Sequence, residues 1–315
     1  MVSLTQDSPI FLLAGYTAVG KTELSLQWAE QNDAEIVSCD ALLFYRGMDI
    51  GTAKPDVTER EQVQHHLIDI CDVDEPMDIR SYLRKAEEAV RDIQARGKKV
   101  LITGGSGFYL KAFFAPVVDD LPVDESLRKK LESRLSQDGL ADLVSELIEL
   151  NPVGLEDLLD INNPRRVVRA LERCLISGKS IVQLREDFLK GSNWLMERER
   201  KIVLLERPVD ELKERIETRV QKMINQGLIQ EVESLLLQGI KKNHSASSAI
   251  GYRETISWLE ESRKDVEGLM KEIAMNTRRL VKKQRTWFRH QLPEHNIVHV
   301  SDADEGTNAF SRLFN

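Results

Sequence analysis

Residues 15–22 read Gly15-Tyr16-Thr17-Ala18-Val19-Gly20-Lys21-Thr22. They match the phosphate-loop pattern G-x-x-x-x-G-K-[ST] at every fixed position. The apolar run 10–14 before them predicts a buried strand, and residues 22–30 after them have the apolar spacing of a helix. The alternative is a chance match on a glycine turn, which this strand-loop-helix context disfavours. The stretch therefore predicts an α/β fold with a phosphate site at the end of its first strand.

The predicted loop explains how an anion would be bound. Its successive N–H groups and the helix N-terminus point at one spot and favour negative charge there. Lys21 adds a full positive charge, and the Thr22 hydroxyl is placed to bind a Mg²⁺ ion that bridges phosphate oxygens. The pattern leaves open which phosphate compound is bound and which bond breaks.

The composition is that of an ordinary soluble protein. The chain has 315 residues, enough for one large domain or two, with 30% charged and 41% apolar residues. No apolar run approaches the roughly 20 residues that span a bilayer, and the start has no secretion signal. The three cysteines lie far apart, which argues against zinc or disulfides and fits a reducing cytoplasm. The net charge of −8 argues only weakly against nucleic acid, because local clusters decide such binding.

Alternating strand and helix patterns predict a parallel, doubly wound sheet, with a first core part at 1–118 and a return to the core at 200–315. Residues 119–199 are rich in leucine and charge and predict an all-helical insertion. The remaining strands are predicted at 35–40, 65–70, 98–105, 202–205 and 297–300, and the remaining core helices at 78–96, 209–237 with a break at Gly227, and 266–289.

Asp40 is the acid most suggestive of chemistry. It ends the strand that follows the phosphate-loop helix, and ligands of such sheets bind beyond the carboxyl ends of the strands. It could hold Mg²⁺, act as a general base, or simply cap a turn. The strand 98–105 ends in Thr-Gly-Gly, without the acid that a simple ATPase has there, which disfavours a motor or a switch.

Several other polar residues have both a structural and a functional interpretation. Ser106 could be presented to a ligand, although a helix N-cap is the better prediction from sequence alone. Arg215 and Arg219 could pair with glutamates one turn away, or one of them could reach a leaving phosphate. His65 and His66 are adjacent in a strand pattern, so they face opposite sides and are not expected to bind metal together.

Two basic clusters stand out against the acidic average. One is Arg165-Arg166-x-x-Arg169, which follows Pro164 at a helix start. The other spans Arg278 to Arg289, contains no acid, and interleaves Trp287 and Phe288 with the cations. Basic groups could neutralise RNA phosphates while aromatic faces stack on bases. The alternative for the second cluster is a solvated helix face with Trp287 in the core.

The order of motifs resembles one family. The segments GYTAVGKT, SCDALLFYRGMDIGTAKP, HHLIDI, GGSGFYLKA, NPRRVVRALE, AIGYRE and KKQRTWFR occur as in tRNA dimethylallyltransferases, also called tRNA isopentenyltransferases. The resemblance covers about residues 9–290, and the stretch 46–55 is especially specific. It implies a P-loop NTPase-like core, Mg²⁺ as cofactor, and transfer of a dimethylallyl group from its diphosphate to N6 of adenosine 37 in tRNAs that read codons beginning with U.

The resemblance also implies roles for particular residues. The loop Gly15, Tyr16, Thr17, Ala18, Val19, Gly20, Lys21 and Thr22 would bind the diphosphate instead of ATP, with Thr22 at the metal. Asp40 would be the base near N6, and Arg219 would lie on the diphosphate. The implied tRNA contacts, with 119–199 as the anticodon-loop domain, are Asp40, Ala41, Leu42, Leu43, Ser106, Arg128, Arg165, Arg166, Val167, Val168, Arg169, Ser248, Ala249, Ile250, Gly251, Tyr252, Arg253, Lys282, Lys283, Gln284, Arg285, Thr286, Trp287, Phe288 and Arg289.

The chain departs from the family pattern at a few positions. Tyr16 stands where proline is usual, Ala41 replaces the usual serine after the aspartate, and Ser106 replaces threonine but keeps a hydroxyl. The C-terminal zinc finger of longer eukaryotic members has no counterpart, so the chain resembles the bacterial type. We expect a monomer with tRNA and dimethylallyl diphosphate as partners. The alternatives are an adenylate prenyltransferase or nucleotide-type kinase on the same fold, and a non-catalytic RNA-binding protein.

Overall fold

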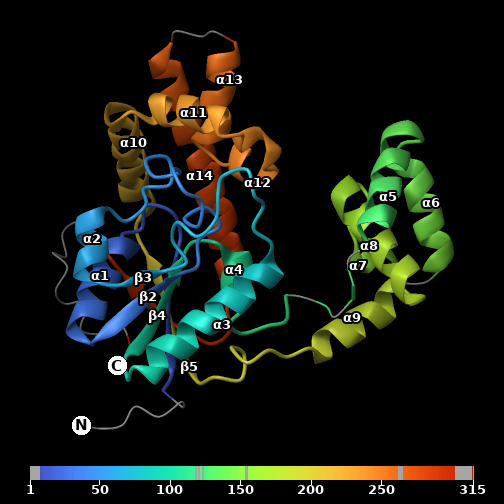
Figure 1. Cartoon of the computed structure of the whole chain (residues 1–315), viewed down its shortest axis with the longest axis horizontal. Helices are drawn as coiled ribbons and strands as arrows, with labels where there is room; N and C mark the ends of the chain where they lie inside the picture. Colours follow the sequence, from blue (N-terminus) through green and yellow to red (C-terminus); the bar gives the residue numbers. More distant parts are fainter. Residues whose placement is uncertain are drawn as a thin grey trace. The chain divides into compact units, whose positions relative to one another are not determined.

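In a computed structural model of the chain, β1 (Ile10–Gly15) lies inside a six-stranded parallel sheet (Figure 1). The strand order is β3-β2-β4-β1-β5-β6. The other strands are β2 (Ala34–Ser38), β3 (His65–His66), β4 (Lys99–Gly104), β5 (Arg200–Glu206) and β6 (Asn296–His299). The structure describes residues 8–117, 119, 121–122, 124–152, 155–261, 265–301 and 314. The predicted α/β fold with a parallel doubly wound sheet is confirmed.

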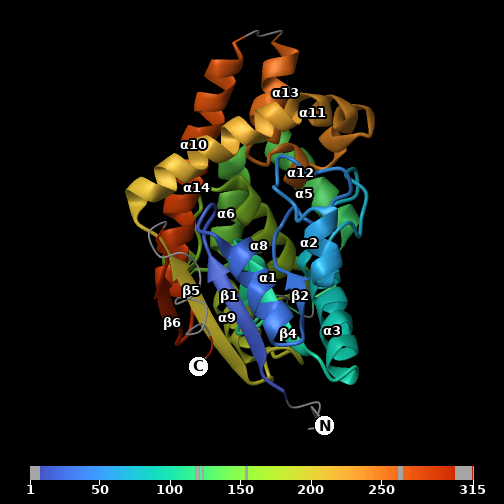
Figure 2. The same ribbon diagram turned by 90° about the vertical axis from the view of Figure 1, so that its left-hand side faces the viewer.

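Helices cover both faces of this sheet. After β1 the chain passes through α1 (Lys21–Gln31) to β2, two places away, and continues to the edge strand β3. Helix α3 (Ile79–Ala95) then returns the chain two places in the opposite direction, to β4. Because parallel crossovers are right-handed, these opposite steps put α1 and α3 on opposite faces (Figure 2). The strands β1, β2 and β4 are almost wholly buried between the two layers.

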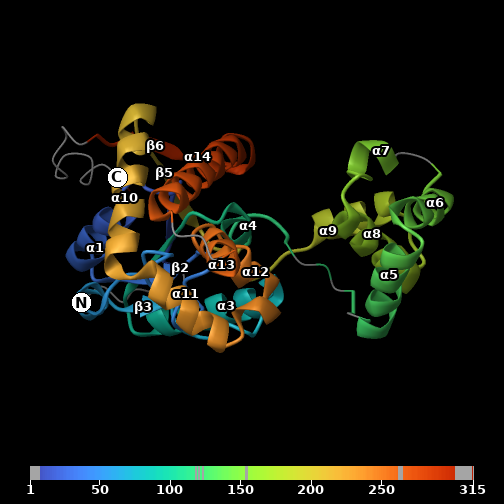
Figure 3. The same cartoon turned by 90° about the horizontal axis from the view of Figure 1, so that it is seen from above.

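The remaining helices of this unit gather around the carboxyl ends of the strands (Figure 3). The longest, α14 (Val266–Gln291), packs against α10 (Val209–Gln226), α13 (Tyr252–Glu260) and α4 (Gly107–Lys111). Gly227, in a left-handed conformation with φ of 100°, ends α10 and begins α11 (Leu228–Leu237), which confirms the predicted break. The short helices are α2 (Val57–Gln62), the 3₁₀ turn Ile240–Lys242 and α12 (His244–Ser247).

The chain divides into a core unit, Met1–Ala115 with Trp194–Asn315, and an insert, Pro116–Asn193. These bounds of the insert differ by a few residues from the predicted insertion, 119–199. The insert has its own apolar core, which includes Leu131, Leu147 and Leu171. Its helices are α5 (Glu125–Gln137), α6 (Leu140–Leu150), α7 (Leu155–Leu158), α8 (Pro164–Ser177) and α9 (Ile181–Lys190).

The predicted strand 65–70 is wrong in its length. Only His65 and His66 pair with β2, because Leu67 and Asp69 adopt positive φ angles of 63° and 54° that turn the chain away. The two histidines do face different surroundings: His66 lies 2.7 Å from the Glu35 carboxylate, whereas His65 lines the cavity beside the phosphate loop. Within the described part of the chain, no helix combines the length and apolar composition needed to span a membrane.

Glu35 on β2 is a buried acid at the centre of an ion cluster. Its carboxylate accepts two hydrogen bonds from the Arg96 guanidinium and lies 3.1 Å from the Lys98 amine. Hydrogen bonds from Arg96, with further ones from His66 and Lys98, outweigh burial and hold the pKa of Glu35 at about 2. The ionised form is therefore favoured in the folded protein.

We expect Glu35→Gln to destabilise the fold by about 3 kcal/mol at neutral pH, which is the free energy of the pKa shift. Because the folded pKa is depressed, this stabilisation is complete above the unfolded value and is lost as pH falls toward 2. Urea unfolding at several pH values measures it. Glu88→Gln, which breaks only an exposed pair with Arg84, is the matched control and should change stability little. Equal losses in both variants would contradict the cluster's role.

Candidate active site

The phosphate loop joins β1 to α1 and lines a cavity at the N-terminus of that helix. Gly20 has a φ of 107° and stands at the N-cap of α1, a conformation that glycine adopts readily. Ala18 also has a positive φ, 66°. Thr17, Ala18, Gly20, Lys21 and Thr22 line a cavity of about 630 Å³ at the helix N-terminus. A helix N-terminus of this kind favours an anion, so the predicted phosphate site falls at this cavity.

Lys21 is held inside this site. Its amine donates hydrogen bonds to the carbonyl oxygens of Gly15 at 2.8 Å and Tyr16 at 3.0 Å. Burial lowers the pKa of Lys21 to about 8; Asp40 opposes this shift and Arg219 adds to it. A bound anion would therefore repay part of the cost of burying this charge.

Two arginines hold the loop through its backbone carbonyl groups. Arg207 donates to the carbonyl oxygen of Val19 at 3.2 Å, and Arg215 donates to that of Ala18 at 3.0 Å. Tyr16 is buried, and its hydroxyl accepts the backbone N–H of Arg207. The tyrosine at the usual proline position therefore ties the loop to the end of β5.

Asp40 lies just beyond β2 and faces the loop. Its Oδ1 accepts the Leu42 N–H at 3.1 Å, so the predicted turn-capping role is present. The same side chain lines the phosphate cavity and a second cavity of about 410 Å³. Capping and chemistry are therefore compatible at this residue, because only one carboxylate oxygen is needed for the turn.

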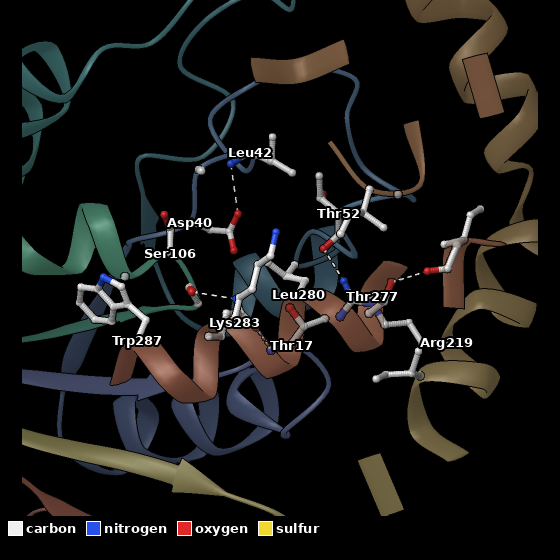
Figure 4. Close-up of a pocket in the computed structure, with 18 of the residues that line it drawn as sticks. Thr17, Asp40, Leu42, Thr52, Ser106, Arg219, Thr277, Leu280, Lys283 and Trp287 are labelled. Carbon is white, nitrogen blue, oxygen red and sulfur yellow. Dashed lines mark hydrogen bonds between the residues drawn. The ribbon is translucent and has the colours of Figure 1, made fainter. Parts of the chain in front are cut away.

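The second cavity lies between the loop, α4, α10 and α14 (Figure 4). Much of its wall is apolar and includes Ile216, Met223, Leu280 and Trp287. Trp287 packs on Gly107, where an added Cβ would lie 2.4 Å from the indole ring. The two cavities share Thr17, Asp40, Thr52, Gly105 and Arg219. A phosphate site and an apolar site thus meet at one acid and one arginine.

Arg219 on α10 does not pair with a glutamate of its own helix. Its Nη2 donates to the carbonyl oxygen of Thr52 at 2.9 Å, and none of the described residues forms an ion pair with it. Burial lowers the pKa of Arg219, although Asp40 acts in the opposite direction. Because an arginine stays charged, this half-buried cation is available to an anion in the cavity.

The predicted N-cap role of Ser106 is wrong. Ser106 stands at the N-cap position of α4, but its side chain makes no capping hydrogen bond and instead lines the apolar cavity (Figure 4). Gln284 was missed as a loop contact. Its side chain accepts the Thr17 N–H at 3.0 Å and donates to the Gly105 carbonyl at 2.9 Å. It therefore connects α14 to both loops of the site.

The α14 segment that was expected to contact tRNA has two faces. Lys283, Gln284, Trp287 and Phe288 line the apolar cavity. Lys282, Arg285, Thr286 and Arg289 line a separate groove against α10. Phe288, not Trp287, is fully buried in the core, so the alternative of a core Trp287 is wrong. The Arg285 guanidinium lies 5.8 Å from the centre of the Tyr16 ring.

Other expected tRNA contacts are only partly accessible. In α8, Arg165 and Arg166 are exposed, but Val167 and Val168 are buried in the insert, so their side chains cannot reach RNA. Arg128 and Arg169 both pair with the buried carboxylate of Glu172. In the stretch 248–253, Ile250 lines the apolar cavity and Arg253 is exposed, whereas Tyr252 is fully buried. Several side chains of these segments are therefore buried or paired, and Arg165, Arg166 and Arg253 are the exposed cations among them.

The remaining expected contacts lie in the core unit. Ala41 and Leu42 line the apolar cavity, and Leu43 lines the phosphate cavity. Ser248 and Ala249 are half-buried. No described group of three or more His, Cys, Asp or Glu side chains could hold a metal ion.

The chain is similar in sequence to known proteins of one family. The family model described as IPP transferase matches residues 43–291. A tRNA dimethylallyltransferase of Opitutus terrae is 51% identical over 299 residues, which cover 95% of each chain. One from an Exiguobacterium species is 39% identical over 290 residues, covering 91% of this chain and 89% of the relative.

Solved structures give the same result. The tRNA isopentenylpyrophosphate transferase of Bacillus halodurans matches with a TM-score of 0.67 at 30% identity, over 96% of this chain and 94% of that chain. A eukaryotic dimethylallyltransferase acting on tRNA has a TM-score of 0.78 at 23% identity, over 97% and 77% of the two chains, which supports the fold. The chain therefore belongs to the IPP transferase family.

Proposed function

We propose that the protein transfers a dimethylallyl group from dimethylallyl diphosphate to N6 of adenosine 37 in tRNAs that read codons beginning with U. The observation that carries this proposal is the meeting of the two cavities at Asp40 and Arg219. The phosphate cavity fits the diphosphate, and the apolar cavity fits the prenyl chain and a base. The relatives are named tRNA dimethylallyltransferases, which supports the same reaction.

The proposed reaction breaks the C1–O bond of the substrate and forms a C1–N6 bond. The adenosine must first leave its stack, because N6 is otherwise out of reach. Negative charge then accumulates on the leaving diphosphate, and the loop N–H groups, Lys21 and Arg219 stabilise it. Asp40 accepts the proton that N6 loses. The products are N6-isopentenyladenosine in tRNA and free diphosphate.

The phosphate cavity also suits a Mg²⁺ ion. Mg²⁺ prefers one or two protein oxygens together with water and substrate phosphates, so no carboxylate cluster is required. Thr22 lines the cavity, and so do Ser38 and Thr103, whose buried hydroxyls have no hydrogen-bond partner among the described residues. We propose that the Thr22 hydroxyl would hold the ion, with the Ser38 and Thr103 hydroxyls as further oxygens of the same cavity. A bound Mg²⁺ would neutralise charge on the leaving diphosphate.

We also propose that tRNA is bound through its anticodon stem-loop. Arg165 and Arg166 are exposed on the insert, and Lys282 and Arg289 are exposed on α14. Their charges suit RNA phosphates despite the acidic average of the chain. Ser106 and Trp287 line the apolar cavity, where the extruded base would be bound.

The deciding experiment incubates the protein with Mg²⁺, radiolabelled dimethylallyl diphosphate, and either unmodified tRNA or AMP. We expect label in tRNA, located by digestion at adenosine 37 and absent from a tRNA carrying guanosine there. Label in AMP alone would instead identify an adenylate prenyltransferase. The absence of label from tRNA would reject the proposal.

A further inference from the structure

Glu231 on α11 is an acid outside the reacting groups, yet it makes an unusually complete set of contacts. Its carboxylate accepts hydrogen bonds from three successive backbone N–H groups: Asp49 at 3.1 Å, Ile50 at 2.7 Å and Gly51 at 3.2 Å. The Tyr252 hydroxyl donates a fourth, at 2.7 Å. Such charge-assisted bonds are stronger than neutral ones, so the carboxylate fixes this loop firmly.

The loop that Glu231 holds leads directly to Arg219. Gly51 is followed by Thr52, whose carbonyl oxygen accepts the hydrogen bond from Arg219 Nη2. Tyr252 supports the same turn by packing, because a Cβ at Gly51 would lie 2.6 Å from its ring. A shift of the loop would therefore move the acceptor that orients the guanidinium.

The loop that begins at Asp49 is also held by Lys54, independently of Glu231. The buried Lys54 amine pairs with Asp49 at 2.6 Å and with Asp69 at 2.5 Å, and it donates to the Tyr45 carbonyl. We expect these contacts to keep the loop folded when Glu231 is replaced. Glu231 then determines the placement of the peptide groups from Asp49 to Thr52.

We propose that Glu231 is a positioning residue for the diphosphate site, acting on Arg219 through the loop 49–52. Its carboxylate aligns the three N–H groups, and the Thr52 carbonyl then presents the Arg219 guanidinium to the shared region of the two cavities. The inference rests on the proposed function in one respect, the binding of a diphosphate at this site.

The test is a double-mutant cycle between Glu231→Gln and Arg219→Gln, read out as the dissociation constant of inorganic pyrophosphate with Mg²⁺. Glutamine keeps the shape but turns one acceptor into a donor that faces N–H or O–H donors. We expect Glu231→Gln alone to weaken pyrophosphate binding about 10-fold to 100-fold. In the Arg219→Gln background the same change should cost about twofold or less. The affinity for tRNA should be unchanged.

Glu233→Gln is the matched control, because Glu233 is an exposed acid on the same helix. It should leave pyrophosphate affinity as it was. If Glu231→Gln is too unstable to study, Tyr252→Phe replaces it in the cycle, since the ring remains against Gly51 and only one hydrogen bond to Glu231 is lost.

Equal losses from Glu231→Gln in both backgrounds would overturn the proposal, as would a loss of thermal stability with unchanged pyrophosphate affinity. The outcome does not depend on tRNA prenylation. A protein that binds pyrophosphate with the predicted coupling but does not label tRNA would retain this inference and lose the proposed function.

Discussion

Replacing Asp40 with asparagine is expected to lower the rate of prenyl transfer by at least about 100-fold, which is the usual contribution of a general base. Asparagine keeps an oxygen that can accept the Leu42 N–H, so the turn after β2 should survive. It cannot accept the proton from N6. Single-turnover transfer of labelled dimethylallyl groups to tRNA measures the effect.

Two further measurements separate catalysis from binding in this variant. The dissociation constant of tRNA should stay within about twofold, because the change keeps the shape of the side chain. Pyrophosphate affinity should be measured as well, because the substitution also removes a charge that acts on Lys21. Burial lowers the pKa of Lys21 to about 8, and Asp40 is the group that opposes that shift. Glu23→Gln is the control, since Glu23 is an exposed acid that lines the same cavity. Parallel losses of tRNA binding and turnover would refute Asp40 as the base.

The features of this protein that are determined by residues close together in the sequence could be predicted from the sequence. The pattern 15–22 specifies its own strand, turn and helix, because glycine, lysine and threonine act within one loop. The helices α3, α10 and α14 follow from apolar spacing, and Gly227 correctly marked a break. The predicted strand 65–70 is wrong in its length. Glycine in a sequence indicates where a positive φ angle can occur, but nothing in the sequence indicates the positive φ angles of Leu67 and Asp69.

The long-range contacts of the site were not predictable in the same way. Gln284 meets Thr17 across 267 residues, and Glu231 meets Asp49 across 182. A glutamine within a basic helix and a glutamate within an amphipathic one give no sign of these partners. The spacing of charged residues also could not identify the partner of Arg219. That partner is a backbone carbonyl, a group that every residue carries.

A change of Lys21 to methionine is expected to weaken the binding of pyrophosphate by about 10-fold to 150-fold, the value of a charge-assisted hydrogen bond of about 1.5–3 kcal/mol. Methionine has a similar length and fills the same space without the charge. The Gly15 and Tyr16 carbonyl oxygens lose their donor as well, so thermal stability must be compared in the absence of ligand. Isothermal titration calorimetry with Mg²⁺ gives the affinity.

The pH dependence of this affinity provides the sharper test. Burial holds the pKa of Lys21 at about 8 in the free protein, and a bound anion raises it. Below about 8 the amine is already charged, whereas above it the protein must take up a proton to bind pyrophosphate. The affinity should therefore fall by up to tenfold for each pH unit above 8. Pyrophosphate itself also changes its protonation in this pH range, and this affects both proteins equally. The quantity to compare is therefore the ratio of the affinities of the unchanged protein and the Lys21→Met variant, which should approach one as pH rises. A ratio that stays constant from pH 7 to 10 would show that Lys21 keeps its charge throughout, and a different group would then have to account for any loss of affinity.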